Sequence, residues 1–304
     1  MTPLVSIVTP CFNAAQFIEE TVQSVLAQDY PRIEYIVMDA GSTDGTLDIL
    51  KRYQGRLRWV SQRDRGAADA INRGFSLSHG EIFAFLNADD LYLPGAIATA
   101  VRALQADPKA AAVYGDAWWT TESGEHIGPY PVRDFDRDLL GRECFICQPA
   151  AFIRREAFEN AGGMDPELHL TFDYELWMRL TRVYEMRRIA GRLASSRMHR
   201  SNKTLGNRRE VFRETFRIMR RHYGYIPFSW IYAYVSNRAD GRDQFFDPLR
   251  PSMLRYLESL PMGLFLNRRK PGRYLAEWCS IMSWAGLLRR LKQIKPRMNT
   301  NEHE

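Results

Sequence analysis

The chain has 304 residues, of which 45% are hydrophobic and 26% charged; this globular composition excludes collagen-like, low-complexity and acidic disordered proteins. Four cysteines are too few for a disulfide scaffold at this length, so we expect a reducing compartment. The net charge of +6 is unevenly distributed: residues 1–181 hold 16 Lys/Arg and 26 Asp/Glu, residues 182–222 hold 13 and 3, and residues 251–304 hold 10 and 4. The basic last part favours an anionic partner.

The start of the chain, MTPLVSIVTP, has no Lys or Arg before its apolar run, and no uncharged stretch of membrane-spanning length follows. We therefore expect neither a secretory signal nor a transmembrane helix. The expected location is cytoplasmic, either free or peripheral on the inner face of the membrane.

Three short apolar runs, at 5–9, 34–38 and 82–86, are nearly continuous, which is typical of buried parallel strands. Between the first two, residues 18–26 carry apolar side chains at helical spacing, with Asn13 as the expected N-cap. The alternation of strand, helix and strand predicts an α/β fold with a Rossmann-like sheet.

Later segments carry turn and helix signals. After residue 225 the composition changes, because aromatic residues, prolines and Arg/Lys clusters interleave. We predict an α/β catalytic domain at 1–205 and a basic, aromatic-rich, mostly helical region at 206–304. After the first hundred residues we expect a hairpin turn at 121–125 and helices at 154–161, 174–183 and 210–222. The helix at 154–161 is expected to stop at Gly162-Gly163.

Two of the predicted strands run directly into acidic residues. Asp39 ends the second strand and opens the segment DAGSTDG. Ligands of open α/β sheets bind outside the carboxyl ends of the strands, and the small residues here leave space for a flat base or a phosphate. This segment by itself is equally compatible with an ordinary turn.

The third strand runs into FLNADD, which ends in the adjacent acids Asp89 and Asp90. Two neighbouring carboxylates repel each other in a cleft, and a divalent cation bridging to a diphosphate would remove that cost. Oxygen ligands suit Mg²⁺ or Mn²⁺. In the alternative interpretation Asp90 caps a following helix while Asp89 binds the metal.

In this order and on these strands, the motifs resemble those of the inverting family 2 glycosyltransferases with a GT-A fold, over about residues 4–205. The matching segments are VSIVTPCFN, IVMDAGSTDGT, DRGAADAINRGF, GEIFAFLNADD, CQPAAFIRREAFENAGGMD, FDYELWMRL and HRSN. The resemblance implies a mixed sheet flanked by helices, a nucleotide-sugar donor and a divalent cation. It implies that the donor pocket is formed by residues spread over the first part of the chain: Thr9, Pro10, Asn13, Asp39, Asp69 and Asn72.

Within that implied pocket, Asp39 would hydrogen-bond the base, and Asp69 and Asn72 would approach the sugar or the diphosphate. Asn87, Ala88 and Asp89 stand where the family has its DxD motif. Asn87 replaces the first Asp; it can accept from a ribose hydroxyl and also donate to one, but it brings no charge for a metal. Asp89 is then the principal metal ligand.

An inverting transfer needs a carboxylate that takes the proton from the attacking hydroxyl. Asp173, in TFDYE, matches the family's catalytic aspartate and opens a predicted helix, whose dipole and free N–H groups would hold it ionised. The alternatives are that Asp173 is only an N-cap, or that Glu175 is the base.

By resemblance, His199 in RMHRSN would reach the metal or the diphosphate, although a lone histidine is more often a packing residue. Arg197, Arg200 and Lys203 would neutralise the leaving diphosphate. Gln148 would face the acceptor.

In residues 225–304 aromatic and aliphatic clusters adjoin Lys/Arg, as in interfacial helices. We expect either an anionic membrane surface as partner, with Trp278 and Trp284 inserted, or a helical subdomain with a solvated basic face. The acidity of the first part disfavours nucleic acid.

The sequence thus predicts inverting transfer of a sugar, from a donor such as a UDP-sugar, to a hydroxyl of a lipid-linked or surface glycan in envelope polysaccharide synthesis. A sugar-phosphate nucleotidyltransferase is the alternative enzyme, although it would need a Gly-rich basic loop at 9–13. A non-catalytic nucleotide-binding partner protein is the non-enzymatic alternative.

Overall fold

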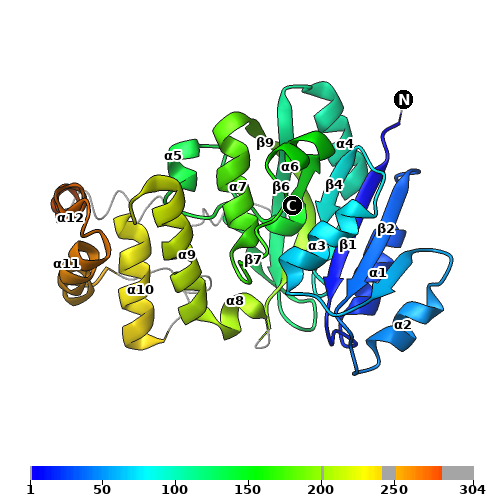
Figure 1. Cartoon of the computed structure of the whole chain (residues 1–304), viewed down its shortest axis with the longest axis horizontal. Coiled ribbons are helices and arrows are strands. Elements are labelled where there is room, and N and C mark those ends of the chain that lie inside the picture. The colour runs from blue at the N-terminus through cyan, green and yellow to red at the C-terminus, as the bar shows by residue number, and fades with distance from the viewer. Residues whose placement is uncertain (1, 200–201, 242–250, 283–304) are drawn as a thin grey trace, which may run out of the picture. The chain divides into compact units, whose positions relative to one another are not determined.

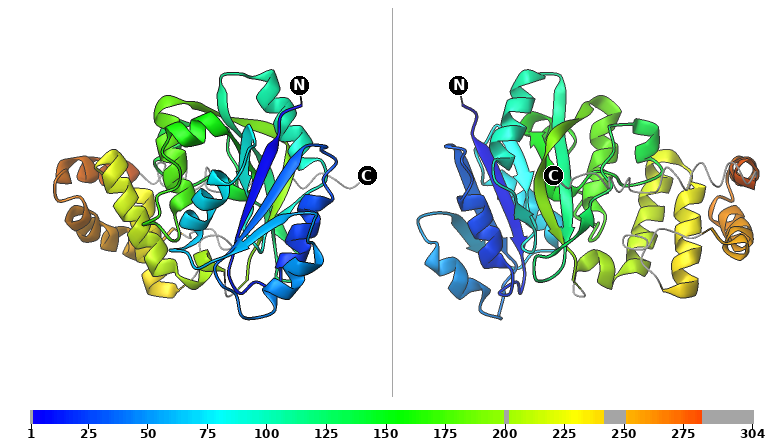
Figure 2. Two further views of the ribbon diagram at one scale, coloured as in Figure 1. Left: turned by 45° about the vertical axis from the view of Figure 1, so that its right-hand side comes forward. Right: turned by 180° about the vertical axis from the view of Figure 1, so that it is seen from behind.

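The computed structural model describes residues 2–199, 202–241 and 251–282 (Figures 1 and 2). The chain divides into two compact units, one formed by 1–137 with 144–206 and the other by 138–143 with 207–304. The boundary after residue 205 stays a prediction about domains, and it did not anticipate that 138–143 groups with the second unit.

The first unit alternates strands and helices along the chain. Its elements are β1 (Val5–Cys11), α1 (Ile18–Leu26), β2 (Ile33–Asp39), α2 (Thr46–Arg52), β3 (Arg58–Ser61), α3 (Ala67–Ser76), β4 (Ile82–Phe85), β5 (Leu91–Tyr92), α4 (Ala96–Ala106), β6 (Ala110–Thr120), β7 (His126–Pro129), the 3-10 helix η1 (Gln148–Ala150), β8 (Ala151–Arg154), α6 (Arg155–Asn160), α7 (Phe172–Val183), β9 (Glu185–Arg197) and α8 (Lys203–Gly206). The short α5 (Arg137–Leu140) begins in this unit and ends in the other.

All of these strands form one mixed sheet in the order β3-β2-β1-β4-β8-β6-β9-β5, with β7 paired to β6. The first four are parallel, whereas β8 is antiparallel to both β4 and β6. The predicted Rossmann-like β-α-β start is therefore confirmed, and the sheet becomes mixed only beyond β4.

Successive residues of a strand point to opposite faces of a sheet, and both faces are covered here. Val5 and Ile7 belong to a core shared with α1, α2 and α4. On the other face Phe83 stacks on Phe75 of α3, with ring centroids 4.2 Å apart. Figure 1 shows α3 and α6 in front of the strands. Because α3 lies so close, a Cβ added at Gly74 would be 2.5 Å from Val8 Cγ1.

The predicted helices and hairpin turn are confirmed, with one difference at the first helix. The turn at 121–125 joins β6 to β7, and α6 ends before Gly162 and Gly163, which both have positive φ. Asn13 does not cap α1, because Phe17 occupies that position. The Asn13 side chain instead accepts a hydrogen bond from the Thr43 N–H.

The second unit is a helical subdomain built around aromatic side chains. Its helices are α9 (Arg208–Tyr223), α10 (Phe228–Asp240), α11 (Met253–Leu266) and α12 (Pro271–Met282). Trp278 is buried, stacks on Tyr256 at 4.3 Å and donates its indole N–H to the Tyr256 carbonyl and the Ser259 hydroxyl. The prediction that Trp278 inserts into a membrane is therefore wrong, and Trp284 lies outside the described residues. Among the helices that are described, none is both long and apolar enough to span a bilayer.

Candidate active site

The carboxyl ends of β1, β2 and β4 meet at one edge of the sheet, because these strands are parallel and adjacent. Cys11 pairs with Asp39 across β1 and β2, and Val8 pairs with Phe85 across β1 and β4. Burial and the nearby charges of Asp39, Asp44 and Asp89 raise the pKa of the Cys11 thiol. The acids predicted from two separate motifs therefore gather around the end of β1.

The loops after β1 and β2 hold each other in place. The Asn13 N–H donates to the Ser42 hydroxyl at 2.8 Å, and the Asn13 side-chain oxygen accepts from the Thr43 N–H at 2.9 Å. Asn13 has φ +47°, a left-handed conformation that asparagine tolerates better than most residues. This conformation turns the chain at the end of β1. Asn13 therefore lies at the carboxyl edge of the sheet, where its two hydrogen bonds link the loop after β1 to the loop after β2.

Asp39 is almost fully buried, and its carboxylate accepts several hydrogen bonds from other groups of the protein. One oxygen accepts from the Gly41 and Ser42 N–H groups and from the Ser61 hydroxyl; the other accepts from the Ser42 hydroxyl. Asp39 is only 1% exposed. Its bond to a base stays a prediction, and it would have to use the one lone pair that remains on the second oxygen.

The strand residues Thr9 and Pro10 are buried in β1. The Thr9 hydroxyl lies 3.0 Å from the hydroxyl of buried Tyr35, so it faces the protein core. The sequence analysis overlooked Phe12, which is 63% exposed one residue past the end of β1. An aromatic residue directly after the first strand, where a buried apolar side chain is not required, was the available signal.

The turn after β4 is organised by the amide of Asn87. Its nitrogen donates to Asp90 at 3.1 Å and to Gln148 at 3.0 Å. With both hydrogens used, only the Asn87 oxygen is left for a ribose hydroxyl, so the expectation that Asn87 also donates to the ribose does not fit this arrangement. Gln148 is itself buried and donates to the Phe85 carbonyl, which makes it a support of this turn.

Asp90 does not cap a helix, because β5 follows directly and α4 begins only at Ala96. Its carboxylate accepts from the Arg197 N–H at 3.0 Å, at the end of β9. Burial, together with the neighbouring charge of Asp89, raises the pKa of Asp90 to about 8. This raised pKa favours the protonated form of Asp90, which would relieve the repulsion expected between the two acids. The Thr21 hydroxyl further fixes the turn by donating to the Ala88 and Asp90 carbonyls.

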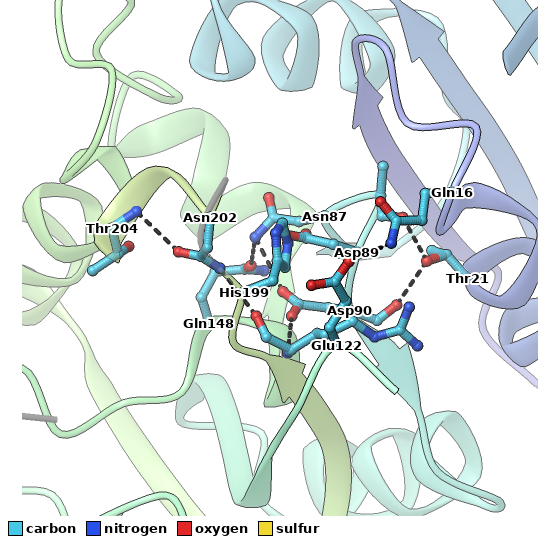
Figure 3. A network of polar contacts seen from close by, with 12 residues as sticks. Gln16, Thr21, Asn87, Asp89, Asp90, Glu122, Gln148, His199, Asn202 and Thr204 are labelled. Carbon is cyan, nitrogen blue, oxygen red and sulfur yellow. Dashed lines mark hydrogen bonds and ion pairs between the residues drawn. The ribbon is translucent and has the colours of Figure 1, made fainter. Parts of the chain in front are cut away.

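Asp89 and His199, 110 residues apart in sequence, meet in the structure (Figure 3). The His199 Nε2 atom lies 2.9 Å from an Asp89 carboxylate oxygen, with the Asp89 side chain 23% exposed and that of His199 only 6%. The His199 ring packs on Phe17, with centroids 4.6 Å apart. The two residues that the resemblance assigned to the metal therefore lie in contact, and their binding of a metal stays a prediction.

Arg197 has a structural position that differs from the predicted one. It is 2% exposed, forms an ion pair with Glu20, and places its guanidinium over the Phe17 ring. The expectation that Arg197 neutralises a leaving diphosphate is wrong for this arrangement, because its charge is compensated inside the protein. Arg200 lies outside the described residues.

A metal would have to be shared between the protein and a ligand. In residues 2–199, 202–241 and 251–282, no three or more His, Cys, Asp or Glu side chains converge on a common metal position. Asp89 and His199 supply one carboxylate and one imidazole. The carboxylate suits Mg²⁺ or Mn²⁺ bound through few protein ligands with substrate phosphates completing the shell, whereas the imidazole is a softer ligand than Mg²⁺ prefers.

Asp69 and Asn72, on α3, are both engaged within the protein. Asp69 accepts from the Arg65 N–H and pairs with the Arg65 guanidinium at 3.2 Å. Asn72 donates to the Met164 carbonyl at 2.9 Å and accepts from the Met164 N–H at 2.8 Å. Their contacts with a sugar or diphosphate stay predictions; in the structure Asn72 ties α3 to the turn that leads towards α7.

Asp173 and Glu175 in the first turn of α7 differ in their environments. Asp173 is half-buried and is the second residue of the helix, after the N-cap Thr171, so the interpretation of Asp173 as an N-cap is wrong. Glu175 is fully buried and paired with Arg179 at 2.7 Å. The charges of Asp90 and Asp173 both raise the pKa of buried Cys147, so Asp173 lies within electrostatic range of the residue next to Gln148.

Comparison with known proteins identifies the family. The model of "Glycosyl transferase family 2" matches residues 6–162, more than half of the chain. The chain belongs to glycosyl transferase family 2. An uncharacterized glycosyltransferase of Rickettsia felis is 31% identical over 225 residues, covering 68% of this chain and 36% of that protein. The chain thus spans about a third of the length of this relative.

Further similarities concern a shorter relative and two solved structures. The putative teichuronic acid biosynthesis glycosyltransferase TuaG of Bacillus subtilis is 46% identical over 92 residues, 29% of this chain and 36% of TuaG. S. aureus TarS 1–349 in complex with UDP has TM-score 0.62 at 16% identity, covering 96% of this chain and 88% of that one. The mannosyltransferase PcManGT of Pyrobaculum calidifontis, in complex with GDP-Man and Mn²⁺, has TM-score 0.53 at 21% identity, covering 96% and 79%.

These findings confirm the resemblance, the GT-A type of fold and the assignment as a glycosyltransferase. Among the relatives, TuaG is the one named for teichuronic acid biosynthesis in this comparison. The family membership argues against the alternative that the chain is a sugar-phosphate nucleotidyltransferase. Such an enzyme would need a Gly-rich basic loop after the first strand, and the loop after β1 contains no Gly, Lys or Arg.

Proposed function

We propose that this glycosyltransferase moves a sugar from a nucleotide-sugar donor, with inversion, to a hydroxyl of a lipid-linked or surface glycan. The observation that carries this proposal is that Asp39 and Asp89 both lie near the end of β1 and that His199 contacts Asp89. The half-buried Asp173 lies within electrostatic range of Cys147, beside this edge. That edge is where ligands of α/β sheets bind.

The donor would lie across the ends of β1, β2 and β4. The exposed ring of Phe12 offers a stacking surface for a base, and base–aromatic stacking contributes about 1–3 kcal/mol. The remaining acceptor site of Asn87 suits a ribose hydroxyl. A UDP-sugar is the proposed donor, supported by the UDP complex of the structural neighbour TarS.

The chemistry would be a single displacement. Asp173 would remove the proton from the acceptor hydroxyl as its oxygen forms the new bond to the anomeric carbon. The bond from that carbon to the diphosphate breaks at the same time, and the nucleoside diphosphate leaves. A divalent cation held by Asp89 and His199, when bound, would offset the charge of that diphosphate.

The half-buried position of Asp173 favours it over Glu175 as the base. Glu175 is fully buried, and its carboxylate already accepts hydrogen bonds from Arg179. A base must reach the proton that it abstracts, and Glu175 would have to leave its ion pair to do so.

Donor hydrolysis in the absence of acceptor tests this proposal. Purified protein is incubated with a panel of nucleotide-sugars and Mg²⁺ or Mn²⁺, and released nucleoside diphosphate is measured. We expect slow release from one donor class, and anomeric analysis of the glycoside formed with an added acceptor is expected to show inversion. No release from any donor, with or without metal, or retention of configuration, would contradict the proposal. The transfer is proposed to occur at the cytoplasmic face of a membrane, as the nature of the acceptor suggests.

A further inference from the structure

The second unit exposes apolar side chains along one helix. Of the eight large hydrophobic residues that are exposed in the described part of the chain, five lie on α11 and α12. On α11 these are Met253, Leu254, Leu257 and Phe265, at 62%, 59%, 53% and 69% exposure. At helical spacing the four fall within an arc of about 120°, and together they form what we call the apolar stripe.

The opposite side of α11 is the one that packs against the subdomain. Tyr256, Ser259 and Gly263 are buried there, and the Tyr256 hydroxyl donates to the Trp278 carbonyl at 2.6 Å. The helix therefore presents its larger aliphatic side chains outwards. Isolated exposed apolar residues are normal, whereas a continuous patch marks an interaction surface.

Cations gather where the stripe ends. Asn267, just after α11, bonds both backbone polar groups of Ile226, so the α11–α12 turn lies against the α9–α10 turn. The side chains brought together there form what we call the basic corner: Arg220, Arg268, Arg269, Lys270 and Arg273, all exposed. The Arg220 guanidinium donates to the Leu266 carbonyl, the last residue of α11, at 3.1 Å.

Nearby acids do not cancel this charge. Residues 251–282 contain two, Glu258 and Glu277. Glu258 pairs with Arg255 at 2.7 Å, so the charge of Glu277 is the one left in these residues to set against the five cations of the basic corner. The partner of this surface must therefore be apolar in one part and anionic in the adjoining part.

We propose that α11 lies in the plane of an anionic lipid bilayer. The apolar stripe would enter the boundary between headgroups and acyl chains, and the basic corner would contact anionic headgroups. The helix has 14 residues, a length of about 21 Å, and the basic corner lies at its C-terminal end, so the stripe and the corner adjoin each other. The inference does not depend on the chemistry of the first unit.

The test is flotation of the full-length protein with vesicles. We expect binding to phosphatidylcholine vesicles that contain phosphatidylglycerol, much weaker binding to phosphatidylcholine alone, and weakening at high salt. Leu257→Ser with Phe265→Ser should lower binding by at least about tenfold. Arg268→Ser with Arg269→Ser should lower it by about fivefold per cation removed.

Matched controls come from exposed residues of the first unit. Ile127→Ser with Val183→Ser removes two exposed apolar side chains, and Arg102→Ser with Lys109→Ser removes two exposed cations. Both should leave vesicle binding unchanged, and thermal melting and donor hydrolysis are followed for every variant to show that it folds.

Three results would overturn the proposal. The first is no binding to anionic vesicles at low salt. The second is binding that the stripe variant and the basic-corner variant both retain but that removal of 283–304 abolishes, which would place the contact in that segment. The third is sedimentation of the wild type as a dimer that Phe265→Ser dissociates, without vesicle binding, which would make the stripe a contact between copies.

Discussion

The strands β2 and β4 both run into an aspartate at the same edge of the sheet, but the two carboxylates have different environments. Asp39, the last residue of β2, accepts four hydrogen bonds from the loop that follows it and from Ser61 on β3, and it is 1% exposed. Asp89, after β4, keeps 23% of its side chain exposed and lies 2.9 Å from His199.

The difference arises from the loops. After β2 the chain turns back at once, so that the backbone N–H groups of Gly41 and Ser42 reach the carboxylate. After β4 it is Asp90, one residue later, that turns inwards to meet the Arg197 N–H. An acid at a strand end is thus used for folding or left available for a ligand according to which residue of the turn points inwards.

The largest effect is expected at the third carboxylate of the site, which belongs to neither strand. Asp173→Asn should lower turnover by about 10²–10⁴ and leave donor affinity within a few-fold, because asparagine is nearly isosteric but cannot accept the proton. Steady-state kinetics and calorimetric donor binding measure the two effects. Near wild-type turnover would remove Asp173 from the role of base. As a control, Glu175→Gln should lower the melting temperature, because it leaves the partly buried Arg179 charge without its carboxylate partner.

The second prediction concerns Asp90, the inward-pointing acid of the turn after β4, and the dependence of the unfolding free energy on pH. Its pKa of about 8 in the folded protein lies above the ordinary value of 3.8, so the folded state binds the proton more tightly than the unfolded state. The resulting stabilisation is fully present below about pH 4 and is lost as pH rises towards about 8, at up to about 1.4 kcal/mol per pH unit. In Asp90→Asn this dependence should disappear, as measured by urea unfolding of metal-free protein between those pH values. Parallel stability curves for the two proteins would show that Asp90 is ionised in the fold.

Asp39→Ala should test how far the β2 acid serves folding. The buried N–H and hydroxyl donors that it satisfies would lose their acceptor, which should lower the free energy of unfolding by about 2–4 kcal/mol. Nucleotide binding should weaken equally with and without metal. An unfolding free energy equal to that of wild type would show that the link between the two loops does not need this carboxylate.

Asp89→Ala should have the smallest effect on folding and a selective effect on the donor. Its side chain is partly exposed, so stability should change by less than about 1 kcal/mol. The metal-dependent part of donor affinity should fall by at least about tenfold, since even outer-shell partners of metal sites contribute this much. Donor titrations with and without Mn²⁺ measure it. A wild-type donor affinity that does not respond to metal would exclude the metal role of Asp89.

The sequence predicted the architecture of the first unit because its signals are local. Continuous apolar runs such as 5–9 and 82–86 indicate buried strands wherever they occur, and the glycines at 162 and 163 end a helix by their own conformational freedom. Acids directly after such strands therefore had to meet at one edge. Local signals did not indicate that His199 lies near Asp89. The assignment of both residues to a metal came from the family resemblance.

What the sequence did not predict depends on contacts between distant segments. Glu20 and Arg197, 177 positions apart, form an ion pair. Because of this ion pair, Arg197 does not take the predicted role of neutralising a leaving diphosphate. Asn87 and Gln148 meet across 61 positions, and Trp278 is buried by Tyr256 of another helix. No spacing along the chain indicates any of these contacts.

By itself, the sequence determined the first buried strands, the acids at their ends and the family of the enzyme, because these follow from local patterns and motifs. Only the tertiary structure decided which carboxylate is consumed by hydrogen bonds, which keeps a proton and which stays accessible. The physical reason is that ionisation and availability depend on burial and on partners, and both are set by residues that folding brings together from far along the chain.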